Sequence, residues 1–92
     1  MVKVMVLYEQ VPDAGLYAHH VELCRAVPGG VFRHGAVFGS PFGEPAYRYV
    51  AEWEFGDRAT FAEASRTPEF AETGRHAQEL GVPFTVLFAE AE

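Results

Sequence analysis

The sequence has little cysteine, little positive charge and no long apolar run, and each shortage excludes a class of protein. Cys24 is the single cysteine among 92 residues, which excludes an internal disulfide and a zinc site built from several cysteines. Seven Lys and Arg against thirteen Asp and Glu give a formal charge of −6, whereas nucleic-acid affinity depends on clustered cations. The apolar run Val2–Tyr8 is too short for a membrane span and lacks the features of a secretory signal. We therefore expect a cytoplasmic protein without nucleic-acid or membrane partners.

What the chain does contain is typical of one folded domain. Hydrophobic residues make up 49% of the sequence and aromatic residues 14%, which is too apolar for a disordered chain. A length of 92 residues allows a single hydrophobic core. No linker, internal repeat or low-complexity segment interrupts it. We predict one domain over residues 1–92.

Four stretches have the pattern of β-strands. Val2–Tyr8 is apolar and rich in β-branched residues, which predicts a strand buried on both faces. Val31–Phe38 and Tyr47–Phe55 flank a loop with two glycines and two prolines, which predicts a hairpin-type connection. Phe84–Phe88 is the last predicted strand.

The first predicted helix follows Asp13, whose carboxylate can cap it, and ends at Pro28. Its expected buried stripe repeats at helical spacing and consists of Leu16, His20, Leu23 and Val27.

The second helical region is predicted in two pieces. A short helix capped by Asp57 runs to about Ser65, and a longer one starts at Thr67 with Pro68 in its first position. The longer helix carries a stripe of mostly small residues, which predicts that a neighbour can approach it closely: Phe70, Gly74, Ala77 and Gly81.

The order strand, helix, strand, strand, helix, strand predicts an α+β fold of the ferredoxin-like βαββαβ type, with a four-stranded antiparallel sheet covered by helices on one face. The other face would expose apolar residues of the first strand and Val50, so we expect a homodimer in which two sheets form a barrel. The alternative is a monomer whose open face is hydrated around Arg48, Glu52 and Glu54.

Several segments together resemble the EthD-type family of the dimeric α+β barrel superfamily. They are Val2–Tyr8, His20 ahead of Val27-Pro28-Gly29, Tyr49–Phe55 and Ser65–Glu69. The resemblance spans nearly the whole chain and implies a homodimer with a small-molecule pocket between sheet and helices. The superfamily includes cofactor-free monooxygenases, polyketide cyclases, decarboxylases, lactone isomerases and some haem enzymes. EthD-type members are linked to ether degradation and to aromatic polyketide chemistry.

His20 is the candidate catalytic residue, because the stripe places it at the centre of the apolar face of the first helix. Burial would lower the pKa of its imidazole and keep it neutral near pH 7, which suits a general base. The alternative is a core histidine hydrogen-bonded to a backbone carbonyl.

Three aromatic residues are candidates for binding a flat ligand. Tyr49 and Trp53 share one face of the third predicted strand and could form the wall of an apolar pocket, with Tyr8 adding a hydroxyl at the end of the first strand. The alternative for these residues is ordinary core packing.

The remaining polar residues give weaker signals. Glu52 and Glu54 are expected to pair with Arg48 or its symmetry mate at the dimer interface, since buried carboxylates need partners. His34 and His76 are isolated in the sequence, and no spacing matches a metal motif. Cys24, four residues after His20, is a conceivable nucleophile, although a buried structural thiol is the favoured interpretation.

The resulting hypothesis is a pocket for a small aromatic or polyketide-like molecule that reacts without a bound cofactor. His20 would move a proton while Tyr49 or Tyr8 stabilises an oxyanion, as in a cyclase, decarboxylase or monooxygenase. Two alternatives remain open: a non-catalytic accessory protein that binds a metabolite, and a haem-binding barrel with His20 or His76 as ligand.

Overall fold

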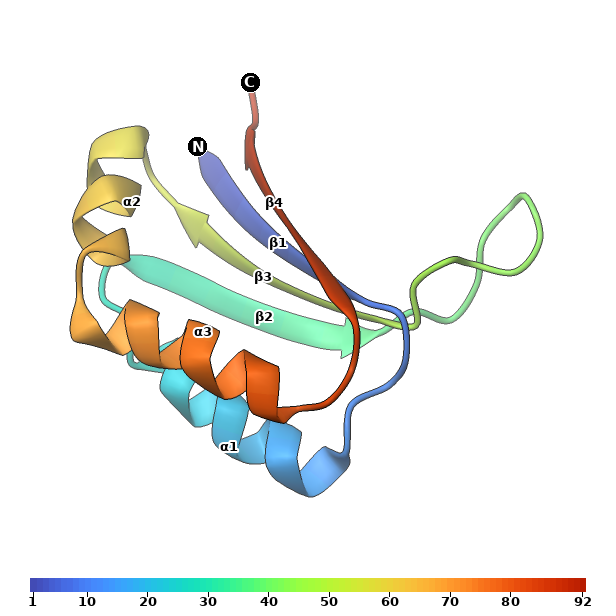
Figure 1. The fold of residues 1–92 in the computed structure, drawn as a ribbon. Coiled ribbons are helices and arrows are strands. Elements are labelled where there is room, and N and C mark those ends of the chain that lie inside the picture. The colour runs from blue at the N-terminus through green and yellow to red at the C-terminus, as the bar shows by residue number, and fades with distance from the viewer.

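A computed structural model describes residues 1–92 and contains seven elements in the predicted order. These are β1 (Val2–Tyr8), α1 (Ala14–Arg25), β2 (Gly30–Ala36), β3 (Tyr49–Phe55), α2 (Arg58–Ser65), α3 (Pro68–Glu79) and β4 (Phe84–Glu90). The strands form one antiparallel sheet in the order β2-β3-β1-β4, and the helices lie on one face of it (Figure 1). The predicted ferredoxin-like α+β fold is confirmed.

Local chemistry explains where the helices begin. The Asp13 carboxylate accepts a hydrogen bond from the Leu16 amide at 2.9 Å, and Asp57 accepts one from the Thr60 amide at 2.8 Å. Thr67 caps α3 in the same way, with Pro68 in the first turn. All three caps are those that the sequence predicts. None of the helices has the length and apolarity that a membrane crossing requires.

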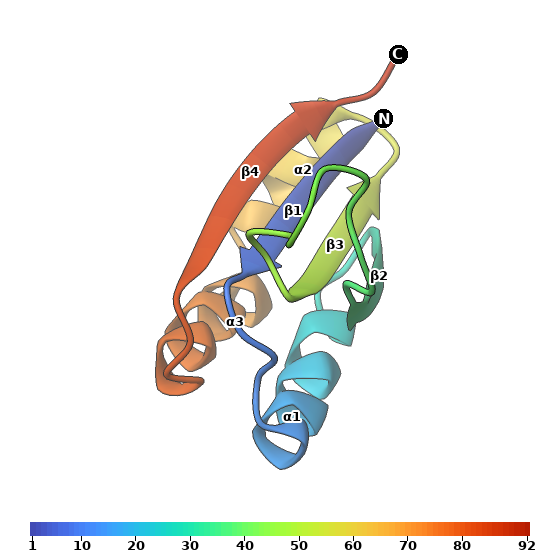
Figure 2. The same ribbon diagram turned by 90° about the vertical axis from the view of Figure 1, so that its right-hand side faces the viewer.

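The core lies between the sheet and the helices. The residues of β1 that face the helices are buried and pair with the aromatic side of β3, as in Val4 opposite Trp53 and Val2 opposite Phe55. The alternate residues of β1, Lys3, Met5 and Leu7, are only half-buried. The prediction that β1 is buried on both faces is therefore wrong for the single chain, because no helix covers the other side (Figure 2).

The buried face of α1 is rotated from the predicted stripe. Tyr17, His20, Val21 and Cys24 are buried, whereas Leu16 is 47% exposed. The prediction is wrong at Leu16 because the aromatic ring of Tyr17 packs against Tyr8 and Tyr49, which turns the helix toward its tyrosine side.

The predicted close approach of a neighbour to the small residues of α3 is not found at Gly74. A side-chain carbon added at Gly74 would meet no atom within 4 Å, and Gly81 lies beyond the helix end with a φ of 68°. The residues of α3 that are buried are Thr73, His76 and Ala77. The contact of α3 with α1 is thus made by His76, whereas the space next to Gly74 is open.

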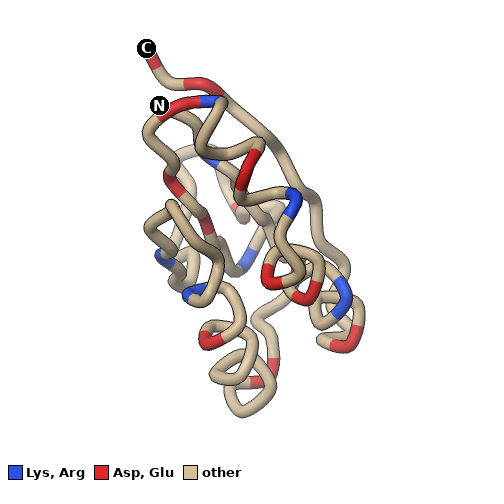
Figure 3. Tube along the Cα trace, turned by 90° about the vertical axis from the view of Figure 1, so that its left-hand side faces the viewer, with Lys and Arg blue, Asp and Glu red and all other residues tan.

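The open face of the sheet carries charged and apolar residues together. Glu52 and Glu54 pair with Lys3 and Arg33 at 3.8–3.9 Å, whereas Arg48 pairs with Glu44 outside the sheet. The predicted pairing of the two glutamates with Arg48 or its symmetry mate requires the dimer and stays a prediction; within the single chain this pairing is not formed. The Lys and Arg residues are scattered along the trace (Figure 3).

Candidate functional site

A cavity of about 140 Å³ lies between the sheet and α3. Side chains from all of β1, β3, β4, α1 and α3 line it, and most are apolar. The lining residues that carry polar side-chain groups are His20, Tyr8 and Thr73. A larger hollow of about 360 Å³ lies between α2 and the ends of β1 and β4, but its only charged groups are the exposed, mutually paired Arg58 and Glu90. The smaller cavity therefore combines enclosure with titratable chemistry.

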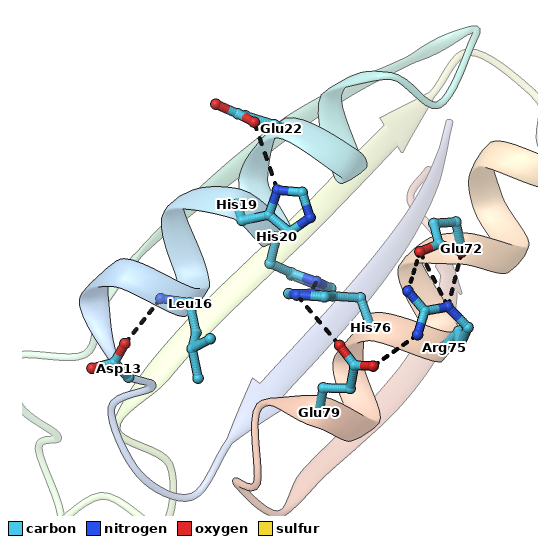
Figure 4. Close-up of polar contacts among 9 residues, drawn as sticks. All are labelled: Asp13, Leu16, His19, His20, Glu22, Glu72, Arg75, His76 and Glu79. Atoms are coloured by element: carbon cyan, nitrogen blue, oxygen red, sulfur yellow. Dashed lines mark hydrogen bonds and ion pairs between the residues drawn. The ribbon is translucent and has the colours of Figure 1, made fainter.

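His20 lies on the cavity wall and forms a hydrogen bond with His76 of α3. Their Nδ1 atoms are 2.9 Å apart, and the two rings stack with centroids 5.1 Å apart (Figure 4). Each residue is only 4% exposed. The predicted burial of His20 is confirmed, but its partner is a second imidazole and not the backbone carbonyl considered in the alternative.

Burial, and to a smaller extent the nearby His76 and His19, lowers the pKa of His20 to about 4. At pH 7 the imidazole is therefore neutral. A hydrogen bond between two neutral imidazoles requires one protonated and one bare Nδ1. Because His20 uses Nδ1 for this bond, Nε2 is the ring nitrogen left for the cavity.

Sequence reasoning missed the part played by His76. The two histidines are 56 positions apart on different helices, and neither belongs to a local motif. The available signal was the helical spacing of Thr73, His76 and Leu80, which places His76 on the buried side of α3.

Tyr8 is the predicted tyrosine that lines the cavity. It is 1% exposed, and burial raises its pKa, so the phenol stays protonated and can donate a hydrogen bond. Its ring lies edge-on to Tyr17, with centroids 5.6 Å apart.

Tyr49 lies outside the cavity that contains His20. Its hydroxyl is 2.6 Å from Nδ1 of His34, and both residues border a separate surface hollow beside Tyr17. Its ring centroid is 6.2 Å from that of Tyr8, so Tyr49 packs against a residue of the cavity wall without lining the cavity itself.

Trp53 lines the cavity with its indole ring. The indole N–H donates to the carbonyl oxygen of Cys24 at 3.0 Å, which fixes the ring and uses its only polar group. The Cys24 thiol is buried, and desolvation raises its pKa to about 12, so it stays protonated at neutral pH.

The shape of the site bears on the haem alternative. The cavity beside His20 is close in volume to the roughly 150 Å³ that accommodates benzene in an engineered protein cavity. A porphyrin, with four linked pyrrole rings, does not fit there in this structure. No three His, Cys, Asp or Glu side chains lie together as the ligands of a metal ion would.

The fold and its dimensions closely match those of solved structures. An EthD family protein from Bacillus halodurans has a TM-score of 0.82 and 28% identity, covering 100% of this chain and 99% of that one. A dimeric ferredoxin-like protein of unknown function from Jannaschia has a TM-score of 0.69 and 19% identity, with 98% of each chain covered. SnoaB, a cofactor-independent oxygenase from Streptomyces nogalater, has a TM-score of 0.63 and 20% identity, covering 98% of this chain and 91% of that one.

The resemblance to EthD-type proteins is thereby confirmed over the whole chain. The two more distant structures show the shared fold alone. No protein-family model and no curated protein matches the sequence.

Proposed function

We propose that this chain is a cofactor-free enzyme of the cyclase, decarboxylase or monooxygenase type, which transfers a proton of a small aromatic or polyketide-like compound. The observation that carries the proposal is a neutral, buried imidazole on the wall of an apolar cavity. A neutral His20 can accept a proton from an acidic carbon or a phenol through Nε2. The fold is also compatible with reactions that need no cofactor, since one protein with this fold is described as a cofactor-independent oxygenase.

The size of the cavity restricts the ligand. A volume of about 140 Å³ admits roughly one aromatic ring. A larger substrate must extend past β4, where Phe88 is 64% exposed and Val86 is also exposed. We infer that one ring is held beside His20 while the rest of a polyketide-like molecule lies along these two side chains.

Tyr8 and Trp53 are the proposed binding residues within the cavity. The protonated phenol of Tyr8 is positioned to donate a hydrogen bond to an oxygen on which negative charge develops when His20 removes a proton. Trp53 offers an aromatic surface for the ring. Tyr49 acts indirectly, by packing behind Tyr8.

The functional unit is proposed to be a homodimer formed by the open faces of two sheets. Met5 and Leu87 are opposite one another on β1 and β4 of that face, and Leu87 is 45% exposed. Covering such apolar side chains favours association of a small domain. Two similar ferredoxin-like proteins are described as dimeric.

The test uses 2-tetralone, a bicyclic ketone with one aromatic ring and acidic benzylic hydrogens, in deuterated water. Proton NMR measures how fast these hydrogens are replaced by deuterium. We expect the protein to accelerate the exchange saturably, and His20→Asn to slow it about 100-fold, the usual contribution of a positioned general base. His19→Asn is the matched control, because His19 precedes His20 on α1 but its side chain is largely exposed.

The rival function is a non-catalytic accessory protein that binds the same class of compound. One observation favours it: the hydrogen bond between His20 and His76 joins α1 to α3 and would hold the helices together without any chemistry. Saturable binding of 2-tetralone, seen as quenching of the single Trp53, without any faster exchange would support this function and refute the enzymatic one.

A further inference from the structure

We propose that His76 and Glu79 form, behind His20, a proton relay that connects the cavity with solvent. This inference rests on the proposed role of His20 as a base. In this arrangement His20 meets the substrate, and His76 and Glu79 are positioning residues that act through it.

The three side chains form a continuous path across the helix layer. His20 lines the cavity, and its Nδ1 is 2.9 Å from Nδ1 of His76, which does not line the cavity. Nε2 of His76, on the far side of its ring, is 3.9 Å from Oε2 of Glu79. Because the Glu79 side chain is 56% exposed, the path runs from a buried ring nitrogen to the surface within three residues (Figure 4).

The polar environment of Glu79 aims one of its oxygens at His76. The Arg75 guanidinium donates to Oε1 of Glu79 at 2.8 Å and also holds Glu72 on its other side. This leaves Oε2 directed toward His76. The gap of 3.9 Å exceeds a hydrogen bond, so a side-chain rotation or one bridging water closes it.

The hydrogen bond between the rings determines which tautomers can work. If Nδ1 of His20 carries the shared proton, its Nε2 is bare and can act as a base in the cavity. Nδ1 of His76 then accepts, and Nε2 of His76 carries a proton that points toward the Glu79 carboxylate. The carboxylate favours this arrangement, because it can accept from an N–H but repels a bare lone pair.

The transfer is balanced as follows. A substrate C–H or O–H bond breaks, its electron pair stays on the substrate, and the proton binds Nε2 of His20. The proton on Nδ1 of His20 moves to Nδ1 of His76, and the proton on Nε2 of His76 passes to Glu79 or water. Both imidazoles end neutral with exchanged tautomers, and the reverse shift restores them.

This route avoids a charge in the interior. An imidazolium on His20 would be desolvated and would face a second imidazole at hydrogen-bond distance. Other groups around His76 are His19, whose ring centroid is 5.0 Å away, and the exposed Glu72 and Arg75 of α3. The relay instead delivers the proton to the exposed Glu79 or to water, so no charge stays on the buried rings.

The first test reads the tautomers and needs no substrate. Long-range ¹H–¹⁵N NMR of the ¹⁵N-histidine-labelled protein at pH 7 distinguishes Nδ1–H from Nε2–H forms. We expect His20 as Nδ1–H and His76 as Nε2–H. Glu79→Gln should shift the pair toward the opposite tautomers, whereas Glu63→Gln, the same charge change on the exposed face of α2, should not. The opposite tautomers in the unchanged protein would overturn the relay.

The second test measures exchange of 2-tetralone in deuterated water. Glu79→Gln should reduce deuterium incorporation severalfold, and added formate should restore it in proportion to its concentration, because the outlet is exposed. His76→Gln keeps a hydrogen-bonding side chain but no relay, and should reduce incorporation at least about tenfold without rescue by formate. Incorporation by Glu79→Gln that equals that of the unchanged protein, or a loss that formate does not restore, would refute the outlet.

The two inferences fail in different ways. Absence of exchange with the unchanged protein contradicts the proposed function, and the tautomer measurement then still decides whether the relay is assembled. Normal exchange that depends on His20 but not on Glu79 or His76 supports the function and refutes the relay.

Discussion

Protonation of His20 should destabilise the fold in a defined pH window. In the unfolded chain His20 has the ordinary pKa of 6.5, whereas in the fold burial lowers that pKa to about 4. Below pH 6.5, therefore, His20 binds a proton in the unfolded state but not in the folded state. The free energy of unfolding must fall as the pH falls from 6.5 toward 4.

The size of the effect follows from the same two pKa values. Between pH 7 and pH 5 the linkage amounts to about 2 kcal/mol, and the full difference approaches about 3 kcal/mol below pH 4. His20→Asn removes the titrating group but keeps a polar atom near the position of Nδ1. The variant is expected to be less stable at pH 7 but to lose about 2 kcal/mol less than the unchanged protein on going to pH 5.

Urea unfolding followed by the fluorescence of Trp53, the only tryptophan, measures both stabilities at a fixed protein concentration. Parallel loss of stability in the two proteins between pH 7 and pH 5 would show that His20 is not held neutral in the fold, and the proposed base would lose its physical foundation.

Two further substitutions test the helix layer and the open face. Gly74→Ala should raise the free energy of unfolding by about 0.5–1 kcal/mol, because a glycine within a helix is entropically costly and the added carbon meets no atom within 4 Å. Urea unfolding measures this free energy, and a decrease would contradict the prediction. Leu87→Asp should convert the proposed dimer to a monomer in sedimentation experiments. The control Leu16→Asp, at a similarly exposed position on α1, should leave the dimer intact. If the Leu87→Asp variant stays dimeric, the interface lies elsewhere.

The elements of this fold could be predicted because each carries its own local signal. The caps at Asp13, Asp57 and Thr67 are read from single residues followed by helical spacing, and the structure confirms all three. The alternation of β3 separates Trp53 from Glu52 in the sequence as it does in space. Such signals are complete within about ten residues, so tertiary packing has little scope to override them.

The site could be predicted only in part, because it is assembled from distant segments. His20 was recognisable from its position on an apolar helix face, whereas His76 becomes its partner only when α3 packs beside α1. The separation of Tyr49 from the cavity has a similar cause. Tyr8 and Tyr49 are paired across β1 and β3, and the ring of Tyr17 on α1 packs against both of them. These ring contacts come from three separate elements, so the sequence alone does not predict them.

The small residues of α3 show how a correct pattern led to a wrong consequence. Small side chains on a helix allow a close approach, and a neighbour in contact with them is the expected result. In the structure the contact with α1 is made by His76, while Gly74, Ala77 and Thr73 face the cavity. The space that small side chains release is therefore on the sheet side, next to His20. These small side chains leave room for an aromatic ring beside the imidazole of His20. The small residues of α3 are therefore part of what makes the proposed proton transfer possible.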